Sequence, residues 1–185
     1  MRRALPAGAA LALVAACGGG SSPRVVTEDL APLRAAAALA PCPTGVGRLP
    51  HLVLPCLGGG PDVTLDSPPS GVPTLVNVYG SWCSPCQREM PVLAAFMARA
   101  KGRVALLGVD TEDEPRLALR FAKDLGQHWP AVVDDDGRLL RHYASGPPVT
   151  LFVDRTGAVV FVHRGPFTSL GQVVTDVQRH LGVAV

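Results

Sequence analysis

The chain has 185 residues, of which 48% are hydrophobic and 17% charged. This length and composition fit one globular unit with an appendage, and they exclude disorder along the whole chain. The formal net charge is +2, only Lys101 and Lys123 are lysines, and the arginines are scattered, so the sequence predicts no nucleic-acid partner. The five cysteines are too few for a disulfide scaffold but suffice for a redox pair and a structural bridge.

The amino terminus has the layout of an export signal. Arg2 and Arg3 precede an apolar stretch over residues 4–16, which is too short to span a bilayer as a helix. The following VAAC, which ends at Cys17, resembles the bacterial lipobox, in which the cysteine receives a diacylglyceryl group and becomes the new amino terminus. We therefore predict a lipoprotein signal peptide over residues 1–16. The alternative is an ordinary cleaved signal with a spare cysteine.

A tether is predicted between the lipidation site and the folded part. Residues 18–23 (GGGSSP) are rich in glycine and serine, which gives a flexible linker, and the segment up to residue 40 is polar and then alanine-rich. We interpret residues 17–40 as this tether, with a possible short helix between its prolines, and residues 41–185 as the ordered domain. Two acyl chains on Cys17 would anchor that domain to the outer side of the cell membrane.

Hydrophobic periodicity predicts the elements of the domain in chain order. Short β-type runs at residues 52–54 and 63–65 flank a GGGP turn and indicate a hairpin. The other expected elements are strands at 74–79, 104–109, 131–133, 150–153 and 159–163, and helices at 84–100, 114–125, 138–143 and 169–181. Because strands alternate with helices after residue 74, we expect parallel strands joined by right-handed crossovers.

Two cysteines three positions apart open the helix that follows the first buried strand. In Cys83-Ser84-Pro85-Cys86, the free N–H groups and the dipole of the helix start favour a thiolate on the first cysteine. Cys83 is therefore the predicted nucleophile, and Cys86, one turn further on, is the predicted resolving cysteine. Pro85 fits here because the first turn does not use its missing N–H.

The same spacing also occurs in zinc sites, which need two further ligands at comparable spacing. Cys42 and Cys56 are the only other candidates after the signal, but 14 residues separate them and they form no second knuckle. The histidines form no paired ligand spacing. The strand-to-helix setting of Cys83 favours redox chemistry, so no metal is predicted.

Two segments resemble one known family. Residues 77–91 (NVYGSWCSPCQREMP) are similar to the N-F-W-A-S-W-C-x-P-C-x-x-E-x-P stretch of extracytoplasmic thioredoxin-like proteins of the TlpA/ResA type. Residues 148–154 (PVTLFVD), followed by Gly157, are similar to the family's P-T-T-F-L-I-D-x-x-G segment. The resemblance implies that Pro148 is cis and packs beside the active-site disulfide, where it would present the backbone of Val149 to an extended substrate.

The resemblance implies a fold and an activity. The expected fold is an α/β thioredoxin-like three-layer sandwich, with a central mixed sheet, flanking helices and an amino-terminal β-hairpin. The expected activity is thiol-disulfide exchange with extracytoplasmic proteins by a membrane-tethered monomer, with cytochrome c maturation as one setting. A membrane thiol-disulfide carrier would supply electrons, and no cofactor beyond the redox-active disulfide is expected.

The chain also departs from related patterns. Cytoplasmic thioredoxins carry a buried aspartate where this chain has Asn77, so another group or water must accept the proton of Cys86. The loop after the next strand offers four acidic candidates, Asp110, Glu112, Asp113 and Glu114, of which we select Asp113. Tyr79 replaces the usual tryptophan of the family.

Substrate contacts are expected beside the cysteines. Trp82 precedes Cys83, so we predict that it is partly exposed and shapes a substrate groove with Ser84, Pro85 and Val149.

Cys42 and Cys56 are predicted to form a structural disulfide in an oxidising compartment. Closing this loop of 14 residues would stabilise the folded state by about 3 kcal/mol. The alternative is a second redox pair that relays electrons, although neither cysteine opens a predicted helix.

Other functions compete with the reductant. An oxidant for the folding of secreted proteins would use the same residues in reverse, and a non-catalytic redox or metal-binding lipoprotein is a further alternative. A peroxiredoxin would need a T-x-x-C setting, and a Sco-type copper protein would need C-x-x-x-C with a distal histidine. The sequence at Cys83 matches neither pattern.

Overall fold

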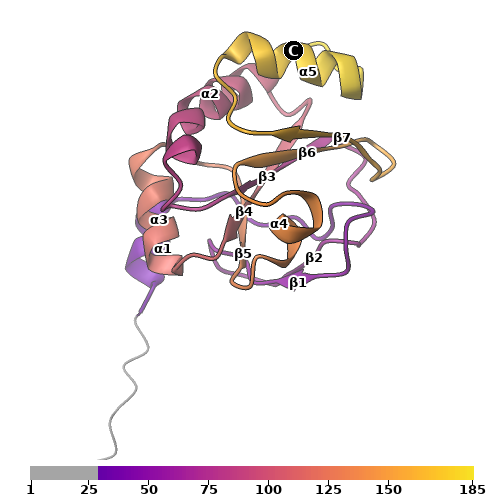
Figure 1. The fold of residues 1–185 in the computed structure, drawn as a ribbon. Coiled ribbons are helices and arrows are strands. Elements are labelled where there is room, and N and C mark those ends of the chain that lie inside the picture. Colours follow the sequence, from indigo (N-terminus) through magenta and orange to yellow (C-terminus); the bar gives the residue numbers. More distant parts are fainter. Residues whose placement is uncertain (1–28) are drawn as a thin grey trace, which may run out of the picture.

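The centre of the protein is a five-stranded sheet with the strand order β5-β4-β3-β6-β7 (Figure 1). The structure is a computed structural model that describes residues 29–185. The strands are β3 (Thr74–Tyr79), β4 (Ala105–Thr111), β5 (Ala131–Asp134), β6 (Val149–Val153) and β7 (Val159–Arg164). The first three are parallel to one another, whereas β6 runs antiparallel to both β3 and β7. The mixed sheet confirms the predicted fold class.

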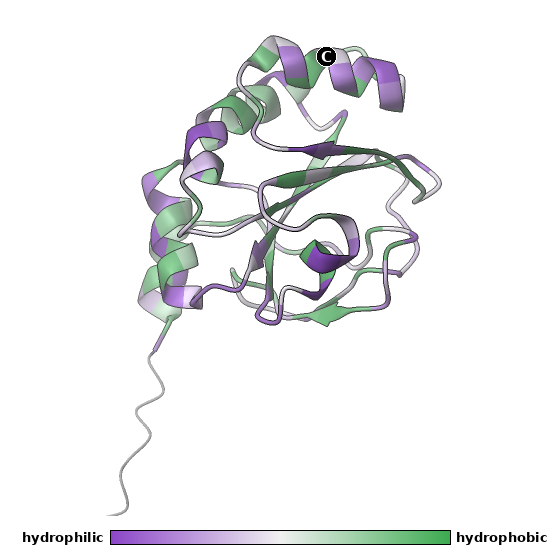
Figure 2. Ribbon diagram, in the orientation of Figure 1, coloured by the Kyte–Doolittle hydropathy of each residue, from purple (hydrophilic) through white to green (hydrophobic). Residues whose placement is uncertain are grey.

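Helices cover one face of this sheet, and a hairpin with a short helix covers the other. The first face carries α2 (Ser84–Ala100) and α3 (Pro115–Asp124), as expected for two successive right-handed crossovers, together with the last helix, α5 (Leu170–Leu181) (Figure 1). The second carries β1 (Val53–Leu54), β2 (Val63–Thr64) and α4 (Arg138–Tyr143). The central strands are mostly green, the colour of hydrophobic residues. The helices α2, α3 and α5 carry both green and purple residues, hydrophobic and hydrophilic, which is typical of amphipathic helices (Figure 2).

The strand β3 and the helix α2 coincide with the predicted residues, but β4 does not. Every residue of β3 is buried, as expected of a strand covered on both faces. The strand predicted at residues 104–109 corresponds to β4. It ends at residue 109 in the prediction, whereas β4 continues to Thr111 because it pairs with β5 there. Asp110 therefore lies within the sheet and is fully buried, not in the acidic loop where the sequence had placed it.

The described part of the predicted tether, residues 29–40, contains the short helix that was expected between its prolines. This helix is α1 (Ala31–Ala37), which lies beside α3 (Figure 1). Ala37 is buried in a cluster with Leu119 and Ala122 of α3, and Arg34 donates to the Leu57 carbonyl at 3.1 Å. Small apolar side chains on one face allow this short helix to pack closely. The predicted signal peptide, Cys17 and the rest of the tether lie outside the described residues.

The predicted Cys42–Cys56 disulfide is present. The two Cα atoms are 6.0 Å apart, and Cys56 also forms an antiparallel bridge with Val132 of β5. The bond therefore joins the segment after α1 to the end of β1, next to the sheet. Both thiols are used in this bond, so neither is free to join Cys83 and Cys86 as a zinc ligand. Within residues 29–185, no helix has the length and apolarity needed to cross a bilayer.

Candidate active site

Cys83 is the N-cap residue of α2, as the sequence predicted. It follows β3 after the three-residue loop Gly80-Ser81-Trp82, and its Sγ accepts a hydrogen bond of 3.2 Å from the backbone N–H of Cys86. The two cysteines form a disulfide with Cα atoms 5.2 Å apart. The first sulfur thus lies where the unpaired N–H groups of the helix start favour a negative charge.

The cysteines differ in accessibility. Cys83 retains 3% of its surface and Cys86 none, whereas the neighbouring Trp82 is 53% exposed, as expected. Ser84 is exposed and Pro85 is half-buried. Cys83 is therefore the sulfur that a partner can approach, and Trp82 is the large apolar side chain next to it.

The peptide bond between Pro147 and Pro148 is cis, as predicted. The carbonyl oxygen of Pro147 lies 3.7 Å from Cys83 Sγ, so the proline pair faces the disulfide. Val149 does not fit the predicted role, because its side chain is buried and its backbone lies between Val78 and Arg164. A carbonyl beside the reactive sulfur comes from Pro147 instead.

Glu89 is the acidic residue that sequence reasoning did not single out. It lies three residues after Cys86 on α2, so the two side chains share one face of the helix. Its Oε1 accepts a hydrogen bond of 2.9 Å from Asn77 Nδ2, and its Oε2 accepts one of 3.1 Å from the Phe167 N–H. Asn77 Nδ2 also donates to Thr150 Oγ1 at 3.0 Å. The available signal was the glutamate of the family motif, at helical spacing from Cys86.

Burial controls the protonation of Glu89. Its side chain is fully buried, and this loss of solvation raises its pKa to about 7 even though the Asn77 and Phe167 hydrogen bonds lower it. A carboxyl with this pKa can both accept and release a proton near neutral pH.

The predicted proton acceptor Asp113 contacts a different part of the site. Its Oδ2 accepts a 2.5 Å hydrogen bond from the Ser81 N–H, and its Oδ1 accepts 2.8 Å from the Glu114 N–H. Asp113 thus contacts the backbone of the loop before Cys83. The other loop candidates, Glu112 and Glu114, are exposed.

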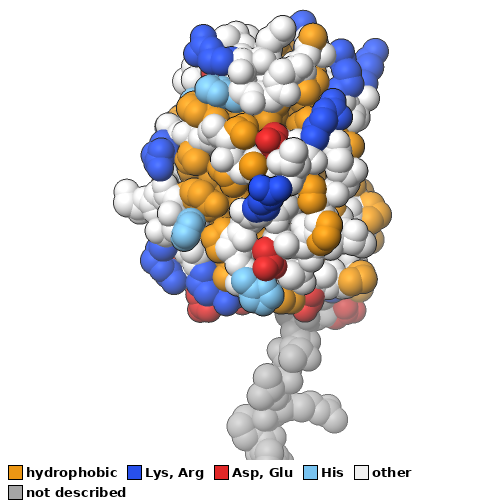
Figure 3. All heavy atoms as spheres, turned by 90° about the vertical axis from the view of Figure 1, so that its right-hand side faces the viewer, with side chains coloured by type: hydrophobic (Ala, Val, Ile, Leu, Met, Phe, Trp, Pro, Cys, Tyr) orange, Lys and Arg blue, Asp and Glu red, His pale blue; other side chains and the backbone are white. Residues whose placement is uncertain are grey.

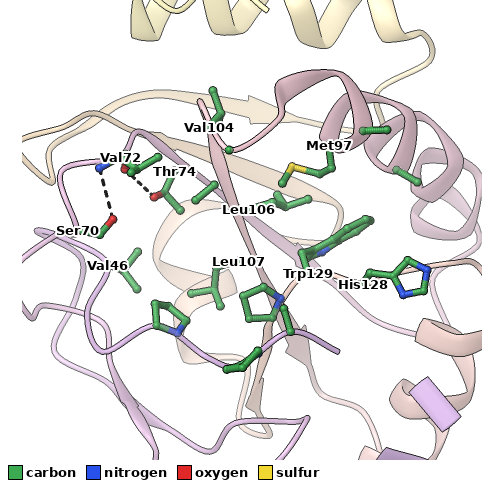
Figure 4. A pocket seen from close by; sticks show the side chains of 18 of the residues that line it. Val46, Ser70, Val72, Thr74, Met97, Val104, Leu106, Leu107, His128 and Trp129 are labelled. Atoms are coloured by element: carbon green, nitrogen blue, oxygen red, sulfur yellow. Dashed lines mark hydrogen bonds between the residues drawn. The ribbon is translucent and has the colours of Figure 1, made fainter. Parts of the chain in front are cut away.

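A cavity of about 630 Å³ lies at the opposite end of the sheet (Figure 4). It is lined by Thr74 and Ala105, the first residues of β3 and β4, whereas Cys83 follows the last residue of β3. Met97 and Trp129 contribute apolar side chains to its wall. None of the predicted active-site residues lines this cavity, so it is separate from the disulfide.

Charges do not gather on the face of the protein shown in Figure 3. Basic side chains there are scattered among acidic and hydrophobic ones. This view shows no continuous charged surface on that side of the protein.

The fold and the site together define a class of protein. A CxxC disulfide opens the helix after a central strand of a mixed sheet, and a cis proline from the neighbouring antiparallel strand faces it. This arrangement is that of the thioredoxin-fold thiol-disulfide proteins.

Comparison with known sequences gives the family. A sequence profile of the AhpC/TSA family matches residues 47–162. The thiol-disulfide oxidoreductase ResA of Geobacillus kaustophilus is 34% identical over 135 residues, which cover 71% of this chain and 73% of the relative. CycY of Rhizobium leguminosarum bv. viciae, a thiol:disulfide interchange protein, is 33% identical over 65% of this chain and 66% of its own. The chain belongs to the AhpC/TSA family and is a thiol-disulfide oxidoreductase of the ResA type.

Solved structures support the fold. A putative protein disulfide isomerase from Bacteroides thetaiotaomicron superposes with a TM-score of 0.61 at 24% identity, covering 75% of this chain and 90% of its own. A secreted disulfide oxidoreductase from Mycobacterium tuberculosis gives a TM-score of 0.58 at 18% identity, over 70% and 96% of the two chains. At these identities the likeness establishes the thioredoxin-like architecture alone.

Proposed function

We propose that this protein exchanges its Cys83–Cys86 dithiol with disulfides of extracytoplasmic proteins while it is tethered to the membrane through Cys17. The observation that carries the proposal is the disulfide at the N-terminus of α2, which faces the cis proline. The work would be done by these two cysteines without a further cofactor, in a monomer.

The first step is attack by Cys83. Its thiolate bonds to one sulfur of the substrate disulfide, and the other substrate sulfur leaves as a thiolate and takes up a proton. The helix start stabilises the attacking thiolate. Trp82 and the Pro147 carbonyl lie beside this sulfur and are suited to contact the approaching segment, with Ser84 and Pro85 at the rim.

The second step releases the product. Cys86 loses its proton and attacks Cys83 Sγ, which closes the internal disulfide and frees the second substrate thiolate. The net reaction moves two electrons and two protons to the substrate. Glu89 is suited to accept the Cys86 proton, because it is buried on the same helix face and its pKa is about 7. This assignment replaces Asp113, whose contacts are with the preceding loop.

The setting follows from the family and the amino terminus. A lipid on Cys17 would hold the domain outside the cytoplasm, where a membrane thiol-disulfide carrier would reduce it again. The resemblance to TlpA/ResA proteins favours the cysteines of apocytochrome c as substrates before haem attachment.

An oxidant is the second candidate, because exchange runs in both directions on the same residues. The midpoint potential of the Cys83–Cys86 couple distinguishes the two directions. A value near the thioredoxin potential of about −270 mV indicates a reductant, and one near about −120 mV indicates an oxidant of folding.

Trapping the mixed disulfide tests the proposal. The Cys86→Ser variant should accumulate a covalent complex between Cys83 and its substrate, because the resolving thiol is missing. The matched Cys83→Ser variant should form none and should lack exchange activity. Exchange by Cys83→Ser at the wild-type rate would refute the proposal, and the trapped protein identifies the substrate.

A further inference from the structure

Asp110 is a buried carboxyl group that the proposed mechanism does not use. It lies on β4 opposite Tyr79 of β3 and Val133 of β5, and none of its surface is exposed. Within residues 29–185, no N–H or O–H group donates a hydrogen bond to either of its oxygens. A charged carboxylate without donors is costly in such a place, whereas a protonated carboxyl can itself donate.

The neighbour that can accept from Asp110 is Asp113. Neither oxygen of Asp110 has a hydrogen-bond partner among the described residues, and Asp113 lies near enough for its charge to raise the Asp110 pKa. Two carboxyls can share a hydrogen bond only if one of them carries a proton. Asp113 already accepts from two backbone N–H groups, which require acceptor oxygens. The shared proton therefore belongs on Asp110.

Asp113 in turn holds the loop that leads to the reactive cysteine. Its Oδ2 accepts from the Ser81 N–H at 2.5 Å. The carbonyl oxygens of Thr111, the last residue of β4, and of Glu112 accept hydrogen bonds from Trp82 Nε1 at 3.3 and 3.1 Å. Three hydrogen bonds thus join the end of β4 and the turn after it to the two consecutive residues immediately before Cys83.

The Trp82 side chain fills the space between the turn after β4 and the loop before Cys83. A Cβ atom added to Gly80 would lie 2.6 Å from Trp82 Nε1 and 3.2 Å from the Thr111 carbonyl oxygen. The Trp82 ring is therefore packed closely over the loop, and a shift of the turn must displace it.

We propose that Asp110 is a positioning residue for the exchange reaction: it keeps its proton, donates its O–H to Asp113, and so fixes the loop that carries Cys83. The inference rests on the proposed function of Cys83. It adds a residue that touches neither substrate nor sulfur and acts through the turn after β4.

The surroundings of Asp110 predict when the contact fails. Burial, and after it the negative charges of Asp113 and of Asp135 in the turn after β5, together raise its pKa to about 9. Tyr79 faces it from β3, and burial and the Asp110 charge raise the pKa of that phenol. Loss of the Asp110 proton would place two carboxylates together, so Asp113 would be pushed away from the Ser81 N–H.

Fluorescence of the oxidised protein tests this without any titrating thiol. In a Trp129→Phe background Trp82 is the only tryptophan, and its emission should change with a midpoint near pH 9 as Asp110 ionises. Asp110→Asn keeps an N–H donor that cannot titrate, so its emission should stay at the neutral wild-type signal from pH 6 to 10. Asp135→Asn is the matched control, because it removes a nearby charge from an exposed residue and should keep the transition.

Exchange kinetics at pH 7 provide the second measurement. Asp110→Ala removes the donor and should slow attack by Cys83 by about tenfold, since small misplacements of reacting groups are costly. Asp110→Asn should restore the rate, and Asp135→Asn should match the wild type. The fluorescence transition is measured without catalysis, so it can succeed or fail independently of the proposed function.

Two results would overturn the inference. One is a transition near pH 9 that persists in Asp110→Asn, because another group would then move Trp82. The other is an Asp110→Ala protein, folded by circular dichroism, that shows the wild-type emission and exchange rate at pH 7.

Discussion

The Asn77 amide donates a 2.9 Å hydrogen bond to Glu89 inside the interface between β3 and α2. Asn77 occupies the position where cytoplasmic thioredoxins carry a buried aspartate. The acidic group has thus moved from the strand to the helix, three residues from Cys86. Asn77 Oδ1 has no hydrogen-bond partner among the described residues, so the amide serves as a donor to its neighbours.

Glu89 makes folding stability depend on pH. Its pKa is raised from 4.5 to about 7, so its contribution is fully present below pH 4.5 and is lost as the pH rises through 7. The loss amounts to about 3 kcal/mol. In Glu89→Gln this dependence should disappear, so urea unfolding of the oxidised variant should give a flatter profile between pH 5 and 8. Asp62→Asn, at an exposed turn, should keep the wild-type slope.

The same substitution tests the proton transfer. The rate at which Cys86 resolves the mixed disulfide should rise through about pH 7 in the wild type as Glu89 becomes able to accept a proton. In Glu89→Gln the rate should be about 100-fold lower and should lack that step. A stopped-flow profile of Glu89→Gln that still rises through pH 7 would assign the proton to another acceptor.

Asn77→Asp should place a second carboxyl beside Glu89. Near pH 5 the pair can share a proton, but at pH 8 the two charges repel and the amide donor is missing. We expect a loss of stability of about 2 kcal/mol at pH 8 and a smaller loss at pH 5. Asn77→Leu removes the donor without adding a carboxyl and should not recover at low pH. Equal losses for Asn77→Asp at both pH values would contradict this explanation.

Removing the second disulfide should affect stability and not chemistry. The double variant Cys42→Ser, Cys56→Ser should lose about 3 kcal/mol of unfolding free energy, because the unfolded chain is no longer cross-linked over 14 residues. Its exchange rate at Cys83 should match the wild type at a temperature where both are folded. A folded double variant that no longer exchanges would favour the electron-relay alternative.

Trp82 should matter more for protein substrates than for small ones. Its side chain is 53% exposed beside Cys83, and burying an aromatic ring against a partner contributes binding energy. Trp82→Ala should lower kcat/KM for a protein disulfide by about tenfold, on the order of 1.4 kcal/mol. The rate with glutathione disulfide should fall less, because that reaction loses only the hydrogen bonds by which the indole holds the loop before Cys83. Leu117→Ala, an exposed apolar residue on α3, is the control.

The predicted anchor can be tested in cells. A labelled fatty acid should be incorporated into the wild-type protein, and the protein should fractionate with the membrane. Cys17→Ala should carry no label and should be released from the membrane, with its exchange activity intact. A Cys17→Ala protein that is still labelled would place the lipid elsewhere.

Local patterns succeeded where the physical cause is local. The bounds of β3 and α2 match the prediction because an apolar run and a proline in the first helical turn specify them directly. The Cys83–Cys86 bond and the cis bond at Pro148 were also foreseen, the first from spacing and helix position and the second from the family resemblance.

Predictions failed where a residue's environment comes from distant parts of the chain. Asp110 is buried because β5 pairs with β4, and Val149 is enclosed because β3 and β7 flank it. Glu89 gained its role from Asn77 and from the Phe167 N–H, 78 residues away.

The sequence by itself determined the chemistry, because a cysteine at a helix start owes its reactivity to the few residues around it. Only the tertiary structure decided which carboxyl groups are buried, and burial depends on strands and loops that meet across long stretches of chain. The acidity of Glu89 and Asp110 is therefore a property of the folded protein, whereas the redox pair is already present in the order of the residues.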